Sequence, residues 1–135
     1  MTLLAMGRIK TPFKFLLILV SLTLSGCGYS AAEHRVTSTT ARTTLESVLK
    51  SWQAGESSES WQQKTPKVVV QDMDWRAGAK LQSFEILGEG EAIDANLHCQ
   101  VKLKFAQPQN GKKEITVTYL VGTSPVLTVF RELGQ

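Results

Sequence analysis

The alternation of apolar and polar residues is clearest between residues 95 and 105. Apolar side chains take every second position there, and polar or basic side chains take the positions between them. Because successive side chains of a strand point to opposite faces, this pattern predicts a strand with one buried and one solvated face, as in an antiparallel sheet covered on one side. The predicted buried face holds Leu97, Cys99, Val101, Leu103 and Phe105.

Two further strands are predicted beside this one. Residues 81–87 have strand character, and the run Gly88-Glu89-Gly90-Glu91 is expected to end that strand in a turn. Residues 114–121 follow the pair Asn110-Gly111, which is the strongest short-range hairpin signal. Their alternation places Tyr119 on the buried face.

The last predicted strand is 126–131, after an interruption at residues 122–125. Residues 68–70, three consecutive valines, favour either a short strand or an extended link, since β-branched residues disfavour helix. Between them and the sheet, the segment 72–80 is rich in turn-forming residues, and Trp75 within it is expected to close one end of the core.

Helical spacing of apolar residues appears earlier, between Ala41 and Trp52, and predicts a helix over about 40–54. Thr40 or Thr43 is the expected N-cap, and Gly55 the expected stop. A second, short helix is predicted over 56–64, with its Trp61 packed on the first helix.

These elements predict an α+β fold: one long and one short helix packed on a curved antiparallel sheet of about four strands. The order of elements over 40–131 resembles the nuclear transport factor 2-like and cystatin-like folds, in which a helix lies across a curved sheet. A looser likeness to exported bacterial lipoproteins lies in residues 75–78 and 120–125. A likeness of fold implies no particular activity.

The N-terminal segment has the three parts of a secretory signal. Arg8, Lys10 and Lys14 are its only charged residues, residues 15–24 are nearly all apolar, and the small residues Ser25 and Gly26 follow. A spanning helix needs roughly 20 apolar residues, about twice what this run offers, which argues against an uncleaved anchor.

The residues Leu24-Ser25-Gly26-Cys27 resemble the lipobox of bacterial lipoproteins. This resemblance implies cleavage between Gly26 and Cys27 and acylation of Cys27, for instance with palmitate. The alternative is an ordinary secretory signal with a chance cysteine. The resulting organisation is a signal peptide over 1–26, a flexible tether over 27–39 and a single α+β domain over 40–135.

Removal of this signal changes the charge of the chain. The whole sequence carries 15 Lys and Arg against 12 Asp and Glu, but three bases and no acid precede Cys27, so 12 of each remain. The excess positive charge belongs to the signal and gives no argument for nucleic-acid binding. The expected partners are the membrane, through the anchor at Cys27, and another envelope protein.

Few residues are candidates for chemistry. Cys99 is the only other cysteine, so no intramolecular disulfide is expected once Cys27 is acylated, and no metal or cofactor motif is found. Asp72, Asp74 and Tyr119 are the candidates for a pocket, although a solvated or capping role for the aspartates and a core-filling role for Tyr119 are the simpler interpretations. His98, Lys102 and Lys104 form a candidate binding face, or only the solvated face of the sheet.

The sequence therefore predicts an exported, lipid-anchored envelope protein whose domain is a non-catalytic binding or structural module. The alternative is a small-ligand carrier or isomerase-like enzyme that uses a cavity between helix and sheet. A cavity with polar groups pointing inwards would favour the alternative, whereas an interior filled with side chains would argue against it.

Overall fold

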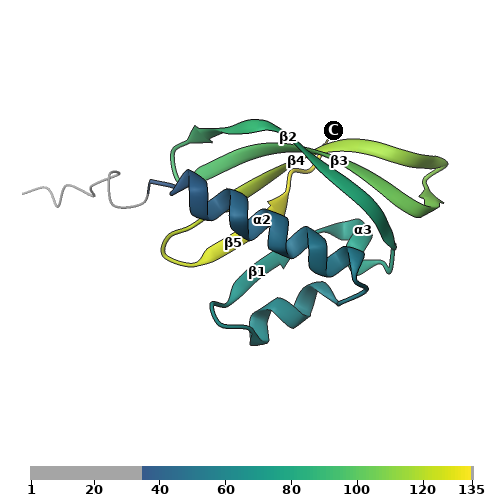
Figure 1. The fold of residues 1–135 in the computed structure, drawn as a ribbon, viewed down its shortest axis with the longest axis horizontal. Helices are drawn as coiled ribbons and strands as arrows, with labels where there is room; N and C mark the ends of the chain where they lie inside the picture. Colours follow the sequence, from purple (N-terminus) through teal and green to yellow (C-terminus); the bar gives the residue numbers. More distant parts are fainter. Residues whose placement is uncertain (1–34, 135) are drawn as a thin grey trace, which may run out of the picture.

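The computed structural model describes residues 35–134 of the 135-residue chain. The predicted signal peptide, Cys27 and the first part of the predicted tether lie outside the described residues. Figure 1 shows one long helix lying across a twisted sheet. The elements are, in chain order, α2 (Ser38–Gln53), the 3-10 helix η2 (Ser58–Gln63), β1 (Val68–Gln71), α3 (Met73–Arg76), β2 (Leu81–Ile93), β3 (Asn96–Gln109), β4 (Lys112–Gly122) and β5 (Leu127–Arg131).

The five strands form a single mixed sheet in the order β1-β5-β4-β3-β2. Strands β2 to β5 are antiparallel to their neighbours, whereas β1 runs parallel to β5, with Val68 opposite Leu127. The α+β class is confirmed, but the prediction of about four antiparallel strands is wrong. The valines of 68–70 form the fifth strand because β5 offers them a partner more than fifty residues further along the chain.

Helix α2 confirms the predicted long helix, and Gly55 confirms its predicted stop. Gly55 has a φ of +88°, a conformation that glycine adopts without steric cost, and its backbone N–H donates to the carbonyl of Trp52. The predicted N-cap is wrong. The helix begins at Ser38 with Thr37 as N-cap, and the hydroxyl of Thr43 donates to the carbonyl of Thr39 within the helix.

Strand β2 continues through the glycines that were expected to end it. Its register against β3 shifts between Leu87 and Glu91, and pairing then resumes as far as Ile93, opposite Asn96. Gly88 and Gly90 both have positive φ, so the chain bulges here instead of reversing. The reversal comes later, next to Asp94, because β3 extends far enough to pair the residues beyond the bulge.

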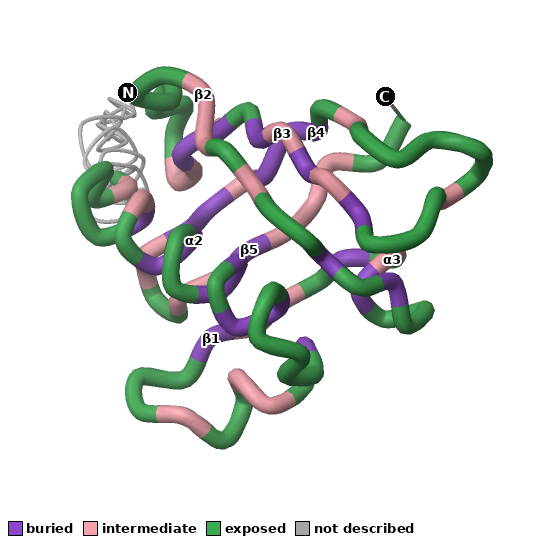
Figure 2. Tube along the Cα trace, turned by 45° about the vertical axis from the view of Figure 1, so that its right-hand side comes forward, coloured by how far each residue is buried: buried purple, intermediate pink, exposed green. Residues whose placement is uncertain are grey.

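The core lies between α2 and the face of the sheet that α2 covers (Figure 2). The whole predicted buried face of residues 97–105 is buried, which confirms the strand pattern. Cys99 belongs to that face, and burial raises the pKa of its thiol. Helix α2 contributes Ala41, Leu45, Val48, Leu49 and Trp52 to the same cluster.

The three tryptophans lie at the C-terminal end of α2. Trp61 contacts this helix and the buried Trp75 closes this end of the core, which confirms both predictions. The indole rings of Trp52 and Trp75 stack in parallel, 5.1 Å apart between centroids. Their N–H groups donate to the carbonyls of Ala79 and Glu56 respectively. The indole N–H of Trp61 donates to the hydroxyl of Ser51, at 2.7 Å, and thereby attaches η2 to α2.

Candidate functional site

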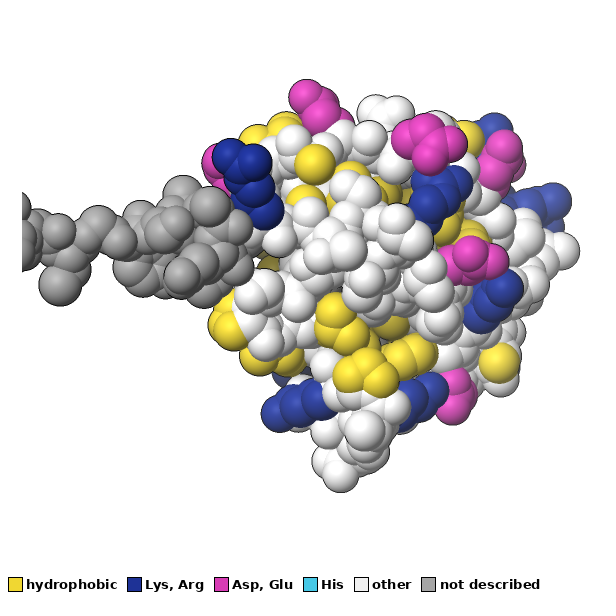
Figure 3. Space-filling model, turned by 60° about the vertical axis from the view of Figure 1, so that its left-hand side comes forward, with side chains coloured by type: hydrophobic (Ala, Val, Ile, Leu, Met, Phe, Trp, Pro, Cys, Tyr) yellow, Lys and Arg dark blue, Asp and Glu magenta, His cyan; other side chains and the backbone are white. Residues whose placement is uncertain are grey.

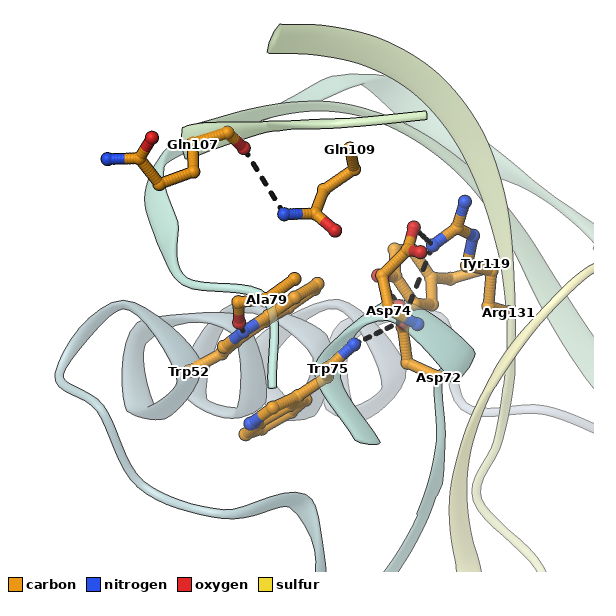
Figure 4. A network of polar contacts seen from close by, with 9 residues as sticks. All are labelled: Trp52, Asp72, Asp74, Trp75, Ala79, Gln107, Gln109, Tyr119 and Arg131. Carbon is orange, nitrogen blue, oxygen red and sulfur yellow. Dashed lines mark hydrogen bonds and ion pairs between the residues drawn. The ribbon is translucent and has the colours of Figure 1, made fainter. Parts of the chain in front are cut away.

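The three candidate pocket residues Asp72, Asp74 and Tyr119 come together at one end of the sheet (Figure 4). Asp72 is the N-cap of α3, and its Oδ1 accepts hydrogen bonds from the backbone N–H groups of Asp74 and Trp75, at 2.9 and 3.1 Å. Its Oδ2 accepts a hydrogen bond from the hydroxyl of Tyr119 on β4. The capping interpretation of Asp72 is therefore confirmed.

Arg131, which the sequence interpretation missed, joins the two aspartates. Its guanidinium lies 3.3 Å from Oδ1 of Asp72 and also donates to Oδ2 of Asp74. Arg131 is opposite Tyr119 in the register of β4 and β5, so the two side chains share a face. The sequence of β5 could have predicted this role of Arg131. Arg131 is two positions after the buried Val129 and therefore shares its face of the strand, and an arginine on the buried face needs an acidic partner.

The electrostatics of this cluster favour a proton held on Tyr119 and a positive charge held on Arg131. Burial and the neighbouring carboxylate of Asp72 raise the pKa of the Tyr119 hydroxyl well above its usual value. Burial lowers the pKa of the Arg131 guanidinium, but the hydrogen bond to Asp74 and the charge of Asp72 outweigh this, so that its pKa is raised.

The carboxylate of Asp72 is already occupied by protein donors. Its side chain has no exposed surface, and it accepts four hydrogen bonds, about as many as a carboxylate accommodates. A general base needs a lone pair directed at a substrate proton, and the cluster offers none at Asp72. An open hollow of about 360 Å³ lies beside the cluster between η2, β1 and α3, where Arg76 and Arg131 contribute to its wall.

The second candidate site, His98, Lys102 and Lys104, lies on the outer face of β3, away from the core. Acidic residues stand opposite each of the three in the neighbouring strands: Glu91 opposite His98, Glu85 opposite Lys102 and Glu114 opposite Lys104. Lys102 also lies 3.7 Å from Glu114 in an exposed ion pair. This face is therefore mixed in charge, and the pocket residues and the face residues occupy separate sites.

Within residues 35–134, no group of three or more His, Cys, Asp or Glu side chains is arranged to hold a metal ion. Over the same residues, no helix is long and apolar enough to span a membrane. Comparison with protein-family models, with curated proteins and with solved structures finds no match to this chain.

Proposed function

We propose that the chain is a lipid-anchored protein of the bacterial cell envelope, on the exported side of the cytoplasmic membrane or at the outer membrane. Its domain acts as a non-catalytic binding or structural module. The observation that carries this proposal is the tetrapeptide Leu24-Ser25-Gly26-Cys27, placed directly behind an apolar run and a basic N-terminal segment. Acylation at more than one position would hold the chain firmly, because a single acyl chain binds a membrane only marginally.

Two features of the domain support a module without catalysis. Side chains of α2 and of the strands fill the space between helix and sheet and form one buried cluster. The most buried acidic group, Asp72, is directed at Tyr119, Arg131 and two backbone N–H groups. These contacts stabilise the fold, so the cluster connects α3 to the sheet instead of facing a substrate.

We also propose a specific arrangement within the α+β class. The single long helix lying across the sheet, followed by four antiparallel strands, supports a nuclear transport factor 2-like or cystatin-like arrangement. The parallel strand β1, at the sheet edge next to β5, is an addition to this arrangement.

Replacement of Cys27 tests the anchor. Cys27→Ser removes the thiol that receives the lipid, so we expect loss of palmitate labelling and accumulation of the uncleaved precursor. The measurement is metabolic labelling with palmitate, together with the mass of the chain. Cys99→Ala is the matched control, because Cys99 is the only other cysteine and is buried in the core. Normal labelling of Cys27→Ser, or loss of labelling in Cys99→Ala alone, contradicts the proposal.

A second candidate function is binding of a small anionic ligand in the hollow beside Asp72. The observation that favours it is the presence of Arg76 in the wall of that hollow, which the apolar Met73 and Leu133 and the acidic Glu59 also line. Titration of the full chain with small carboxylic acids, followed by tryptophan fluorescence, tests it. A saturable change that Arg76→Ala abolishes would support this function, and no change up to millimolar concentrations would contradict it.

A further inference from the structure

The described chain begins at a fixed place on the domain. The backbone N–H of Val36 donates to the carbonyl of Asp94, at 3.5 Å, and the backbone N–H of Thr37 donates to the hydroxyl of Thr123, at 3.0 Å. The chain therefore joins the domain between the β2–β3 turn and the β4–β5 loop. In Figure 1 this end is opposite the β3–β4 hairpin.

The distance from this place to a lipid on Cys27 is limited by chain length. Eight residue steps separate Cys27 from Arg35, and a fully extended chain spans roughly 3.5 Å per residue. An anchor at Cys27 thus keeps this end of the domain within about 30 Å of the bilayer.

Exposed apolar side chains lie on both loops at this end. Ile93 precedes Asp94 in the β2–β3 turn and is 42% exposed, and Val126 belongs to the β4–β5 loop and is 43% exposed. The other exposed large apolar side chains of the described residues, Met73 and Leu133, line the hollow beside Asp72 instead. They provide matched controls for the side chains at the attachment end.

An apolar groove continues from this end along the first half of α2. It has a volume of about 400 Å³, and Val68 and Leu127, which begin the parallel strands β1 and β5, form part of its wall. Figure 3, in which this side of the molecule is turned forward, shows exposed apolar side chains with Lys or Arg side chains beside them. Threonines and Ser47 of α2, together with Trp61 and Pro66, form the rest of its wall.

Basic side chains flank the apolar ones. Lys67 directly follows Pro66 of the groove and is exposed. Lys64 lies 3.9 Å above the ring of Trp61 but is also paired with Glu56, at 3.2 Å, so Lys67 is the more available of the two charges. Arg35 is exposed where the described chain begins. Apolar side chains bordered by Lys and Arg suit the boundary between acyl chains and phosphate headgroups. Two acids, Glu91 and Asp94, lie near Ile93 and limit any attraction to anionic lipid.

We propose that this attachment face, formed by Ile93, Val126 and the groove, rests on the bilayer that holds the anchor. The proposal rests on the proposed function, since it needs the lipid on Cys27. It adds an orientation: the hollow beside Asp72 and the β3–β4 hairpin are then directed away from the membrane.

Lipid quenching tests this orientation with the full acylated chain in phosphatidylethanolamine–phosphatidylglycerol vesicles that contain nitroxide-labelled lipid. A fluorophore is placed on Val126→Cys or, as the matched control, on Leu133→Cys. Cys99 is buried, and the labelled wild-type chain measures its background. We expect quenching at position 126 to be several-fold stronger than at position 133. Equal quenching, or stronger quenching at 133, overturns the proposal.

A second variant tests whether quenching at position 126 requires contact of the apolar side chains with lipid or only a short distance to the anchor. Ile93→Asp should reduce the quenching at position 126 at least twofold, whereas Met73→Asp should leave it unchanged. If Ile93→Asp changes nothing, the apolar face does not contact lipid and the proposal is wrong. Palmitate labelling is measured on the same samples. A chain that is not acylated overturns the proposed function as well, while an acylated chain with equal quenching overturns the orientation alone.

Discussion

Asp72 combines two structural roles in one buried carboxylate. It caps α3 through two backbone N–H groups, and it joins α3 to the sheet through Tyr119 and Arg131. A buried charge of this kind is tolerated only when its partners are in place, because its removal from water is costly. Arg131 completes the set, with its own side chain only 18% exposed.

Removal of single members of this cluster should therefore destabilise the fold unequally. Tyr119→Phe removes one donor, and we expect a loss of about 1–2 kcal/mol in the free energy of unfolding. Asp72→Ala should cost roughly 3–5 kcal/mol, because it also removes the cap and leaves Arg131 with Asp74 alone. Urea unfolding measures both, and the double variant Asp72→Ala/Tyr119→Phe gives the coupling. Additive losses would contradict a direct interaction between the two side chains.

The raised pKa of Tyr119 predicts a loss of stability at alkaline pH. Below about pH 10, the usual value for tyrosine, the hydroxyl keeps its proton in both states and its contribution is complete. Above it, the unfolded chain releases the proton and the folded chain retains it, so the free energy of unfolding falls by up to about 1.4 kcal/mol per pH unit. The buried thiol of Cys99 acts in the same direction from about pH 9.

Unfolding measured between pH 8 and 11.5 in wild type and in Tyr119→Phe checks this prediction. The variant should lose less stability over that range, because only the wild type carries the Tyr119 proton. Parallel pH profiles of the two chains would show that Tyr119 does not contribute. Tyr29→Phe, made in both backgrounds, removes the absorbance of the only other tyrosine and allows the ionisation of Tyr119 to be followed directly.

At the scale of elements, the bulge of β2 allows one strand to contribute to the core at its beginning and to the attachment end at its last residues. Gly90 has a φ of +84°, and a Cβ at this position would lie 3.1 Å from both Sγ of Cys99 and Cγ of Leu97. Gly88, two residues earlier, has a φ of +69° but open space around it, and its carbonyl accepts a hydrogen bond from Arg42 of α2 at 2.5 Å. The two glycines thus differ in their surroundings more than in their backbone.

This difference predicts the effect of alanine at each position. Gly88→Ala should cost about 1 kcal/mol, from backbone strain alone. Gly90→Ala should cost roughly 2–4 kcal/mol, since the added methyl also crowds β3. Urea unfolding of the two variants measures the difference, and Gly88→Ala is the matched control. Equal losses in the free energy of unfolding would contradict this prediction. They would mean that β3 shifts to accommodate the methyl group and that the bulge is loosely packed.

At the scale of the whole molecule, the described residues divide into two ends with different chemistry. The attachment end carries Ile93, Val126 and the apolar groove, whereas the opposite end carries the charged cluster around Asp72, with the exposed Met73 and Leu133 beside it. One core of α2 and sheet residues connects them. In the orientation that we propose, the first of these ends contacts the bilayer and the second stays exposed.

Local patterns in the sequence determined much of this architecture. The alternation over residues 97–105 and the helical spacing from Ala41 to Trp52 each identify a buried face correctly, because side-chain direction in a strand or helix follows from the backbone period. The pair Asn110-Gly111 locates the β3–β4 hairpin for a similar local reason: both residues have positive φ, as such a turn requires.

Tertiary structure decided whatever depends on residues far apart in the chain. The valines of 68–70 become a parallel strand because β5 lies beside them, and the glycines of β2 form a bulge because β3 continues past them. The cluster of Asp72, Asp74, Tyr119 and Arg131 joins residues up to 59 positions apart, so spacing could suggest its members but not their contacts. The proposed lipobox Leu24-Ser25-Gly26-Cys27 was found from the sequence alone, because such a motif is a short peptide pattern that requires no fold. The face proposed to contact the membrane was found only from the tertiary structure, because it is formed by loops that are far apart in the chain.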